Sequence, residues 1–438
     1  MGSKMKDVTP KEEGLNLLDF INASHSSFHA VENMAKMLQA AGFKELRLQD
    51  KWDICEGGLY MVRYNGSALV AFCAHKGVEH EGFRMIASHS DSPTFRIKPN
   101  GTNFKCGAMS RLSTETYGGA ILYSWTDRPL SFAGRVALRS ANSLQPDIRL
   151  IDFEKPLGVI PSVAIHFNRG VNEGAAFNKQ ADMQVLAQAG LLTGMESSNI
   201  SEELSKKLGI DGRDILDFDL YAYDTTPGCL AGFDDSLIIS PKQDNLTMAY
   251  ESVKAFTDTL DSNTSRIVIV MDNEEVGSGT KQGAGSPVVR DIVSRICEKL
   301  NLGEEGFQRA VYNSFLVSAD MAHAVHPNHS ELSDPLNRPI LNGGPVIKYN
   351  ANQKYMTDAD GAAVFRMVCD KAGVPCQTFV NRSDMAGGST LGNIMTSQLP
   401  LRGVDVGNPL LAMHSSRETG GTSDALYLRK ALRTFLTA

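Results

Sequence analysis

The segment RIVIVMDNEEVGS, residues 266–278, leads from a run of strand-forming residues through Asp272 and Asn273 into two adjacent glutamates. Residues 267–270 are all isoleucine or valine, and β-branched residues favour a strand. Two other apolar runs end in a similar way, one at His89 and one at Asp320. Because ligands of open α/β sheets collect at the carboxyl ends of strands, this pattern predicts an α/β sheet with a functional site at that edge.

The runs on either side of this segment alternate between helical and strand-forming patterns. They predict helices over residues 10–24, 28–41, 245–260, 286–300 and 423–436. They predict strands over residues 60–64, 68–74, 83–88, 266–271, 315–319, 346–349 and 378–380. Thr9 and Glu12 have the spacing of a capping box at the start of the first helix. This alternation is typical of an α/β domain.

Residues 94–235 have a different character, with short strand-forming runs between turn residues. The runs are FRIKP (95–99), GGAILYSW (118–125), LSFAGRVALRS (130–140) and PSVAIHF (161–167), with one helical stretch over 183–189. The sequence therefore predicts a β-rich domain over residues 94–235. We expect it to be inserted into a discontinuous α/β domain that comprises residues 1–93 and 236–438.

The composition is ordinary for a globular protein, with 42% hydrophobic and 21% charged residues among 438. A net charge of −7 and the absence of a dense run of Lys or Arg argue against a nucleic-acid-binding protein. The seven cysteines contain no C-x-x-C pair, which argues against a disulfide framework and predicts reduced thiols in a cytoplasmic protein. We expect neither a signal peptide nor a membrane span, because no apolar run approaches the ~20 residues that a span needs.

His89 and Asp91 lie two positions apart at the end of a predicted strand, so both side chains can reach the same point. A histidine that binds a metal usually donates its other N–H to a carboxylate. One residue of this pair could therefore bind a metal while the other orients it. The alternative is a buried histidine whose hydrogen bond is satisfied by the neighbouring aspartate.

Asp320 directly follows a predicted strand and is interpreted as a metal ligand. Three histidines follow it at a spacing of three, His323, His326 and His329. Pro327 interrupts any helix that would place them on one face, so a metal cluster of these histidines is disfavoured. We interpret His323 as a substrate contact near Asp320 and the other two as surface or packing residues.

Asp244 precedes a predicted helix, where it could cap the helix or bridge two metals. Glu274 and Glu275 are adjacent acids behind a strand and would repel each other without a cation or a proton between them. One could ligate a metal while the other takes a proton from water, as metal-assisted hydrolysis requires; a solvated acidic loop is the alternative. His414 follows an apolar stretch, where a lone histidine is usually a satisfied core group.

Several motifs occur in a fixed order along nearly the whole chain. They are ASHSDSPTFRIKP, AIHFNR, DNL, DNEEVGS, SADMAHAVHPN, IKYN, NRSDMAGGSTLG and the region around His414. In these motifs the chain resembles the M18 family of metallo-aminopeptidases, of the aspartyl aminopeptidase type. The resemblance implies a globular α/β catalytic domain with a two-metal exopeptidase site, interrupted by a β-rich dimerisation domain. It also implies two divalent metal ions per subunit, normally zinc.

The resemblance assigns five metal ligands by position. It implies that His89 and Asp320 hold one ion and that Glu275 and His414 hold the other. Asp244 would bridge both ions. Each of the five positions carries a residue type that can ligate zinc, so no position departs from the family pattern.

The resemblance also implies roles for five further residues. Glu274 matches the general base and Asp91 matches the carboxylate that orients His89. His166 matches a histidine that such enzymes lend to the active site of a neighbouring subunit. His323 and Lys348 match substrate contacts, and Lys348 could pair with an acidic first residue of the substrate. A structural lysine on a strand is the alternative for Lys348.

The implied function is removal of single N-terminal residues from peptides, with a preference for Asp or Glu, by a homo-oligomer that assembles into dodecamers. One alternative is a broad-specificity two-metal exopeptidase. Another is a non-catalytic assembly protein that binds peptides or cargo on the same fold. The presence of all ligands and of the base favours an enzyme.

Overall fold

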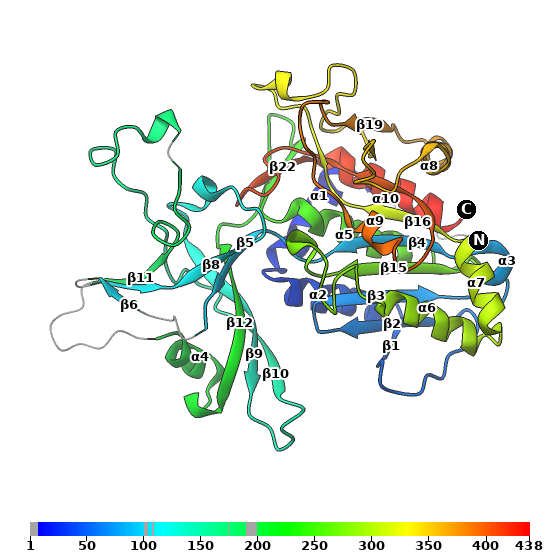
Figure 1. Ribbon diagram of the computed structural model, residues 1–438, viewed down its shortest axis with the longest axis horizontal. Coiled ribbons are helices and arrows are strands. Elements are labelled where there is room, and N and C mark those ends of the chain that lie inside the picture. Colours follow the sequence, from blue (N-terminus) through cyan, green and yellow to red (C-terminus); the bar gives the residue numbers. More distant parts are fainter. Residues whose placement is uncertain (1–7, 100–103, 107–108, 175, 190–198) are drawn as a thin grey trace. The chain divides into compact units, whose positions relative to one another are not determined.

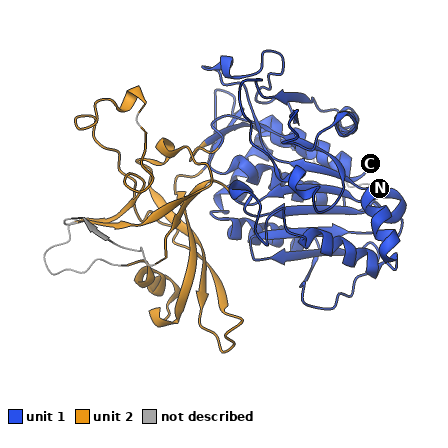
Figure 2. Ribbon diagram, viewed as in Figure 1, with its two compact units in different colours: residues 1–91, 228–413, 418–438 blue, residues 92–227, 414–417 orange. Residues whose placement is uncertain are grey.

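The computed structural model describes residues 8–99, 104–106, 109–174, 176–189 and 199–438. The chain divides into two compact units, which are coloured separately in Figure 2. Unit 1 comprises Met1–Asp91, Gly228–Met413 and Glu418–Ala438, and unit 2 comprises Ser92–Pro227 and His414–Arg417. Among the described residues, no helix combines the length and the apolar composition that crossing a membrane requires.

A nine-stranded mixed sheet forms the centre of unit 1 (Figure 1). Its strands are, in spatial order, β1 (Lys44–Leu46), β2 (Leu59–Tyr64), β3 (Ala68–Cys73), β15 (Arg266–Met271), β4 (Arg84–His89), β16 (Phe315–Ala319), β20 (Arg402–Gly407), β18 (Val346–Tyr349) and β19 (Gln377–Val380). The four strands β15, β4, β16 and β20 are parallel to one another. Their carboxyl ends therefore lie at the same edge of the sheet.

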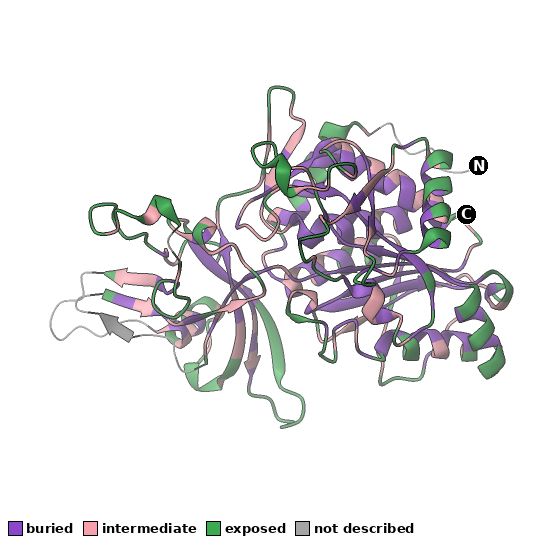
Figure 3. Ribbon diagram, turned by 45° about the horizontal axis from the view of Figure 1, so that its top comes forward, coloured by how far each residue is buried: buried purple, intermediate pink, exposed green. Residues whose placement is uncertain are grey.

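Two hydrophobic cores cover the two faces of this sheet. Along β15, Val268 and Val270 belong to one core, whereas Ile267, Ile269 and Met271 belong to the other. This alternation follows from the two-residue period of a strand. All residues of β15 are buried, as Figure 3 shows for the central strands, which is typical of a parallel strand covered on both faces.

Each core is closed by its own helices. The first receives α1 (Pro10–Asn22), α2 (Ser27–Ala40), α5 (Gln243–Thr257), α8 (Ala359–Ala372) and α10 (Thr422–Leu436). The second receives α3 (Val78–Glu81), α6 (Val288–Lys299), α7 (Gly303–Asn313) and α9 (Leu391–Met395). The predicted capping box is confirmed, because Thr9 accepts from the Glu12 backbone N–H and Glu12 accepts from the Thr9 backbone N–H. The predicted α/β fold class is confirmed.

Smaller elements complete unit 1. β13 (Cys229–Ala231), β14 (Leu237–Ser240) and β22 (Glu418–Gly421) form a three-stranded sheet, and β17 (Ala322–His323) pairs with β21 (Pro409–Leu410). Two short 3₁₀ helices span Glu274–Val276 and Ser330–Leu332. Residues 229–231, which the change in sequence pattern groups with the insertion, thus pair within unit 1.

The described residues of unit 2 form two antiparallel sheets. The larger has the order β10 (Asp147–Asp152), β9 (Leu130–Leu138), β12 (Ile215–Asp224), β5 (Thr94–Ile97) and β8 (Thr114–Tyr117). The smaller has the order β11 (Val185–Ala189), β7 (Met109–Leu112) and β6 (Phe104–Cys106). The described part of the unit also contains α4 (Ile200–Leu208) and 3₁₀ helices over Leu122–Trp125, Val171–Glu173 and Gly212–Asp214. A separate core forms inside unit 2.

Three local predictions in this unit are wrong. Residues 185–189 form strand β11 rather than a helix, because pairing with β7 overrides the helical preference of their alanines and leucine. The run 118–125 contains a 3₁₀ helix over Leu122–Trp125. Among the described residues, no strand pairs with the run 161–167. All of its residues are exposed, and it contains turns.

Candidate metal centre

The three central strands β15, β4 and β16 bring the predicted site residues to one edge of the sheet. His89 is the last residue of β4, and it pairs in register with Met271, the last residue of β15. Asp320 directly follows β16. Because the strands are parallel and adjacent, residues that are more than 200 positions apart in the chain meet at this edge.

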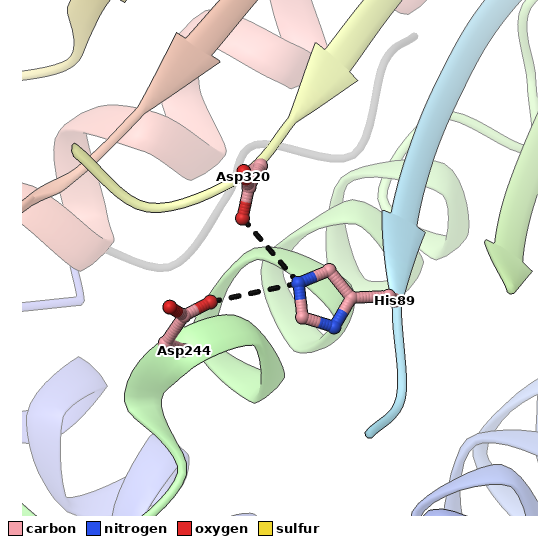
Figure 4. A group of neighbouring side chains, drawn as sticks. All are labelled: His89, Asp244 and Asp320. Carbon is pink, nitrogen blue, oxygen red and sulfur yellow. Dashed lines mark ion pairs between the residues drawn. The ribbon is translucent and has the colours of Figure 1, made fainter. Parts of the chain in front are cut away.

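His89 faces two carboxylates (Figure 4). Its Nε2 atom lies 3.4 Å from Oδ1 of Asp320 and 3.5 Å from Oδ1 of Asp244. All three residues are buried, and their ligand atoms lie within 4.8 Å of one another. Tetrahedral zinc with bonds of about 2.0–2.2 Å keeps its ligand atoms roughly 3.4 Å apart. The spacing and the nitrogen and oxygen donors therefore fit a metal ion.

Asp91 orients both His89 and the two glutamates. The Nδ1 atom of His89 lies 3.3 Å from the Asp91 carboxylate and 3.1 Å from the Asp91 carbonyl oxygen. The two carboxylate oxygens of Asp91 accept hydrogen bonds of 3.2 Å from the backbone N–H groups of Glu274 and Glu275. The carboxylate thus fixes the ring of a ligand candidate and the start of the acidic 3₁₀ helix together.

Glu274 and Glu275 lie close enough to His89 for one atom of each to share a cation. Burial raises the pKa of Glu274 to about 8, and the neighbouring carboxylates of Asp320, Asp91 and Asp244 add to this effect. Burial and the carboxylate of Asp244 also raise the pKa of Glu275 well above its usual value. Both glutamates are partly buried, which distinguishes them from acids on a fully solvated loop.

The acids around His89 act on its protonation as well. Burial opposes the charged imidazolium, but Asp244, Asp320 and Asp91 outweigh burial and raise the pKa of His89 well above its usual value. Several acids in one buried place favour any positive charge among them. Without a bound cation, bound protons supply this positive charge.

Protons and a metal ion should therefore compete for this site. We expect zinc binding to the metal-free protein to release protons, and zinc affinity to fall as the pH falls below the raised pKa values of His89, Glu274 and Glu275. Calorimetric titrations in buffers with different ionisation enthalpies measure the number of protons released. Zinc binding without net proton release would contradict this electrostatic description of the site.

Asp244 is positioned by residues on three other elements. Its backbone N–H donates to Oε2 of Glu418 in β22 at 3.0 Å. The amide of Gln243 donates to the carbonyl oxygens of Ile238 and Glu418, and the amide of Asn245 donates to the carbonyl oxygen of Ala319. The φ and ψ angles of Asp244 are not helical, and its Oδ1 atom faces His89. Together these bonds fix the carboxylate at the start of α5.

Sequence reasoning missed these supporting residues. Gln243 and Asn245 flank Asp244 with side chains that can both donate and accept, which is a weak signal for a backbone under constraint. Glu418 follows Asp244 by 174 positions. Strand pairing between β14 and β22 brings the two together, and that pairing has no local signature.

Lys348 is buried on β18 and points to the same site. Its exposed fraction is 2%, and its Nζ atom lies 3.1 Å from Oδ2 of Asp320 and 3.0 Å from the carbonyl oxygen of Met321. Burial disfavours the ammonium ion, but Asp320, together with Tyr355 and Asp405, outweighs burial and raises the pKa of Lys348. His323 is exposed on β17, with its ring 5.7 Å from that of Phe379. Lys348 therefore carries a positive charge directly against a metal-ligand candidate.

The remaining two candidates belong to unit 2. His414 begins the short segment 414–417, and its Nδ1 atom lies 3.2 Å from the carbonyl oxygen of Gly119. It directly follows Met413, which packs against the first core of unit 1. His166 is exposed in the turn-rich run 161–167. Unit 1 by itself thus brings together His89, Asp91, Asp244, Glu274, Glu275, Asp320 and Lys348.

Almost the full length of the chain matches known proteins. The family described as Aminopeptidase I zinc metalloprotease (M18) matches residues 20–436. The probable M18 family aminopeptidase 2 of Clostridium novyi is 44% identical over 422 residues, which cover 96% of this chain and 97% of that protein. The protein of the same description from Pseudomonas aeruginosa is 40% identical over 425 residues, which cover 96% of each.

Solved structures agree with these matches. A chain in the cryo-EM structure of the Ape4 and Nbr1 complex is 36% identical with a TM-score of 0.92, over 100% of this chain and 88% of that one. An M18 aminopeptidase from Thermotoga maritima, at 22% identity, shares the fold with a TM-score of 0.86 over 99% of this chain and 97% of that one. The chain therefore belongs to the M18 family of aminopeptidases, which are metal-dependent peptide hydrolases.

Proposed function

We propose that the protein binds two metal ions and removes single N-terminal residues from peptides. The observation that supports this proposal is the convergence of His89, Asp244 and Asp320, together with Glu274 and Glu275, at the carboxyl ends of parallel strands. A non-catalytic binding protein has no need to keep a partly buried glutamate of raised pKa beside such a ligand set.

We assign His89 and Asp320 to one zinc ion, Glu275 and His414 to the other, and the carboxylate of Asp244 to both. Oδ1 of Asp244 faces Nε2 of His89, and a carboxylate can hold two ions because it has two acceptor oxygens. For His414 the support is chain connectivity, because Met413 before it packs into unit 1. When bound, the metal pair would acidify a water molecule and polarise the scissile carbonyl.

Glu274 is the general base in this proposal. Its backbone is fixed by Asp91, so its carboxylate starts from a defined position beside His89. Positive charge nearby would lower its pKa from about 8 and favour the ionised form that accepts a proton from water. The same carboxylate can then return the proton to the leaving amine. Asp91 holds His89 and the two glutamates in place throughout.

A panel of substrates tests this reaction. We expect hydrolysis of aminoacyl amides with a free α-amine and none of the same compounds with an acetylated amine. Chelation should abolish activity and added zinc should restore it. Cleavage from the carboxyl end, or of amine-blocked peptides, would instead identify the broader two-metal exopeptidase that is the second candidate.

The preference for acidic N-termini rests on Lys348, whose ammonium ion is the buried positive charge beside Asp320. Its contact with Asp320 also suits a second role, in which the lysine only positions that carboxylate. The two roles predict different kinetics, because a specificity residue distinguishes substrates and a positioning residue affects all of them.

Replacing Lys348 by Met therefore separates the roles. We expect kcat/KM for an Asp substrate to fall about 10- to 100-fold more than for a Leu substrate, because a hydrogen bond to a charged group is lost. Replacing the exposed Lys354 by Met is the matched control and should leave the Asp-to-Leu ratio unchanged. Equal losses for both substrates in the Lys348 variant would assign the lysine to positioning alone.

We also propose that the protein is a cytoplasmic homo-oligomer built from dimers through unit 2. Among the residues that the structure describes, nine of the 18 exposed large hydrophobic ones lie in unit 2, and Val163, Ile165 and Phe167 lie beside His166 in the chain. Apolar residues at this density favour burial against another chain. His166 would then reach the site of the neighbouring subunit.

The solved S. cerevisiae mApe1 dodecamer, at 24% identity, shares the fold. Light scattering would measure the mass of this protein's assembly.

A further inference from the structure

His414 begins a segment of four residues that belongs to unit 2, although the chain on both sides of it belongs to unit 1. Met413 before it packs against the first core, and Glu418 after the segment begins β22. The φ angle of His414 is +69°, in the left-handed region that few residues other than glycine adopt. Such a backbone persists only where surrounding contacts hold it in place.

The loop over residues 119–124 contacts both the ring and the backbone of His414. The Nδ1 atom of His414 lies 3.2 Å from the carbonyl oxygen of Gly119, and the backbone N–H of Ile121 donates to the carbonyl oxygen of His414 at 2.9 Å. Because a carbonyl oxygen only accepts, Nδ1 carries the hydrogen of the neutral ring. The lone pair of the ring is therefore on Nε2, the nitrogen that a metal ion would bind.

Ser416 is bonded twice to Ser124 of the same loop. The backbone N–H of Ser416 donates to Oγ of Ser124 at 2.9 Å, and its hydroxyl donates to the carbonyl oxygen of Ser124 at 2.5 Å. Oγ of Ser124 in turn donates to the carbonyl oxygen of Ile121 at 2.7 Å. Ser416 is buried, so losing a partner would leave its polar groups without water to replace the bond. The chain two residues after His414 is thus fixed to the loop that holds the ring.

Arg417 anchors the end of the segment. Its guanidinium donates to the carbonyl oxygens of Thr226 and Pro227, and Nη1 lies 3.5 Å from Oδ2 of Asp224. Asp224 is the last residue of β12, its side chain is fully buried, and it accepts from the backbone N–H of Thr226 at 2.9 Å. Arg417 is therefore held by the end of a strand and by the turn that follows it.

We propose that Ser416 and Arg417 are positioning residues for the metal ion that His414 binds. This inference rests on the proposed function, which assigns His414 to one of the two ions, called here the His414 ion. The bonds of Ser416 and Arg417 hold the backbone of His414 in its left-handed conformation. A ligand that is held in advance loses less conformational freedom when the ion binds, so the affinity for that ion is higher.

Zinc titration of the metal-free protein against a chromophoric chelator measures the two affinities. Replacing His414 by Ala should remove one binding event, which identifies it as the His414 ion. We expect Ser416→Ala and Arg417→Met to weaken the same event about 10- to 100-fold and to leave the other event at its wild-type affinity.

Replacing Arg295 by Met is the matched control. Arg295 also donates to two backbone carbonyl oxygens, those of Leu48 and Asp50, both at 2.6 Å. It is not among the residues assigned to the metal ions, so both zinc affinities should stay at their wild-type values.

The variants separate this inference from the proposed function. If His414→Ala keeps both ions, the assignment of His414 itself is wrong. If it loses one ion while Ser416→Ala and Arg417→Met bind both normally, only the positioning role is overturned. Equal weakening of both ions would also overturn it, because the effect would then pass through Asp244 rather than His414. Should Arg417→Met fail to fold, the same outcomes for Ser416→Ala decide.

Amide hydrogen exchange gives a second readout. By linkage, an ion that binds His414 stabilises the contacts that hold His414 in its binding conformation. Exchange of the backbone N–H groups of Ile121 and Ser416 should therefore slow when the His414 ion binds. It should not slow to the same extent in His414→Ala loaded with its remaining ion. Exchange at these two amides that does not respond to the His414 ion would overturn the proposal.

Discussion

Replacing Glu274 by Gln is expected to lower kcat by roughly 10²- to 10⁴-fold, while the protein still binds its metal. Glutamine preserves the size of the side chain and the backbone hydrogen bond to Asp91, but it does not accept a proton from water. The loss should therefore be in kcat, with KM changed little, because the ligands that would bind the substrate's amine are intact. Steady-state kinetics and metal analysis of the same preparation measure both quantities.

Glu275 provides the matched control, because it is the adjacent residue with the same side chain. Replacing Glu275 by Gln should weaken metal binding, which excess zinc would partly restore, whereas excess zinc should not restore the Glu274 variant. Wild-type activity in the Glu274 variant would remove that residue from the role of base. Loss of metal from it, with retention by the Glu275 variant, would exchange the two roles.

Replacing Arg429 by Met is expected to lower the free energy of unfolding by about 3–5 kcal/mol. Arg429 on α10 donates to Glu13 on α1 at 2.6 Å and to Asp258, just after α5, at 2.7 and 3.1 Å. Glu13 and Glu251 are fully buried beside it. Removing the guanidinium leaves these acids buried without their cation. Chemical denaturation measures the loss.

The exposed ion pair between Arg402 and Asp360 is the control for this substitution. Both side chains are more than half exposed, so replacing Arg402 by Met should cost less than about 1 kcal/mol. A loss of similar size at both positions would mean that burial does not determine the strength of these pairs.

Glu251 gives the same bundle a defined pH dependence. Burial, with Glu13 adding to it, raises the folded-state pKa of Glu251 well above its usual value. An acid with a raised folded pKa contributes stability that is complete below its unfolded pKa and is lost as the pH rises toward the folded pKa. Replacing Glu251 by Gln should therefore stabilise the protein more at about pH 8 than at about pH 5, and the reverse order would contradict the assigned protonation.

The central strands and the residues that follow them could be predicted from the sequence. The strands that precede His89, Asp320 and Glu274 are mainly apolar, and such runs are typical of parallel strands that are buried on both faces. Three strands of that kind must share one edge in a parallel sheet. The position of the site therefore followed from local pattern and one topological rule.

β20 was missed because its sequence RGVDVG contains two glycines and an aspartate, which are all rare in strands. In the fold Asp405 is fully buried and accepts from Ser318, Thr390 and the backbone of Met356. Its partners come from distant segments, so nothing near it in the chain indicates that a buried carboxylate is tolerated there.

The burial of Lys348 and the support from Glu418 were unpredictable for a similar reason. A lysine in a short strand is usually exposed, and here Asp320 and the carbonyl oxygen of Met321 offset the cost of burying it. Glu418 acts on Asp244 through the pairing of β22 with β14. Sequence patterns indicate which residue types follow a strand, whereas these contacts depend on registers between segments far apart in the chain.

Anomalous diffraction from crystals of the zinc-loaded protein, recorded at the zinc absorption edge, tests the two-ion centre most directly. We predict two peaks per chain, both in contact with the carboxylate of Asp244, one beside His89 and Asp320 and the other beside Glu275 and His414. A single peak, or peaks that do not contact Asp244, would contradict the proposed centre.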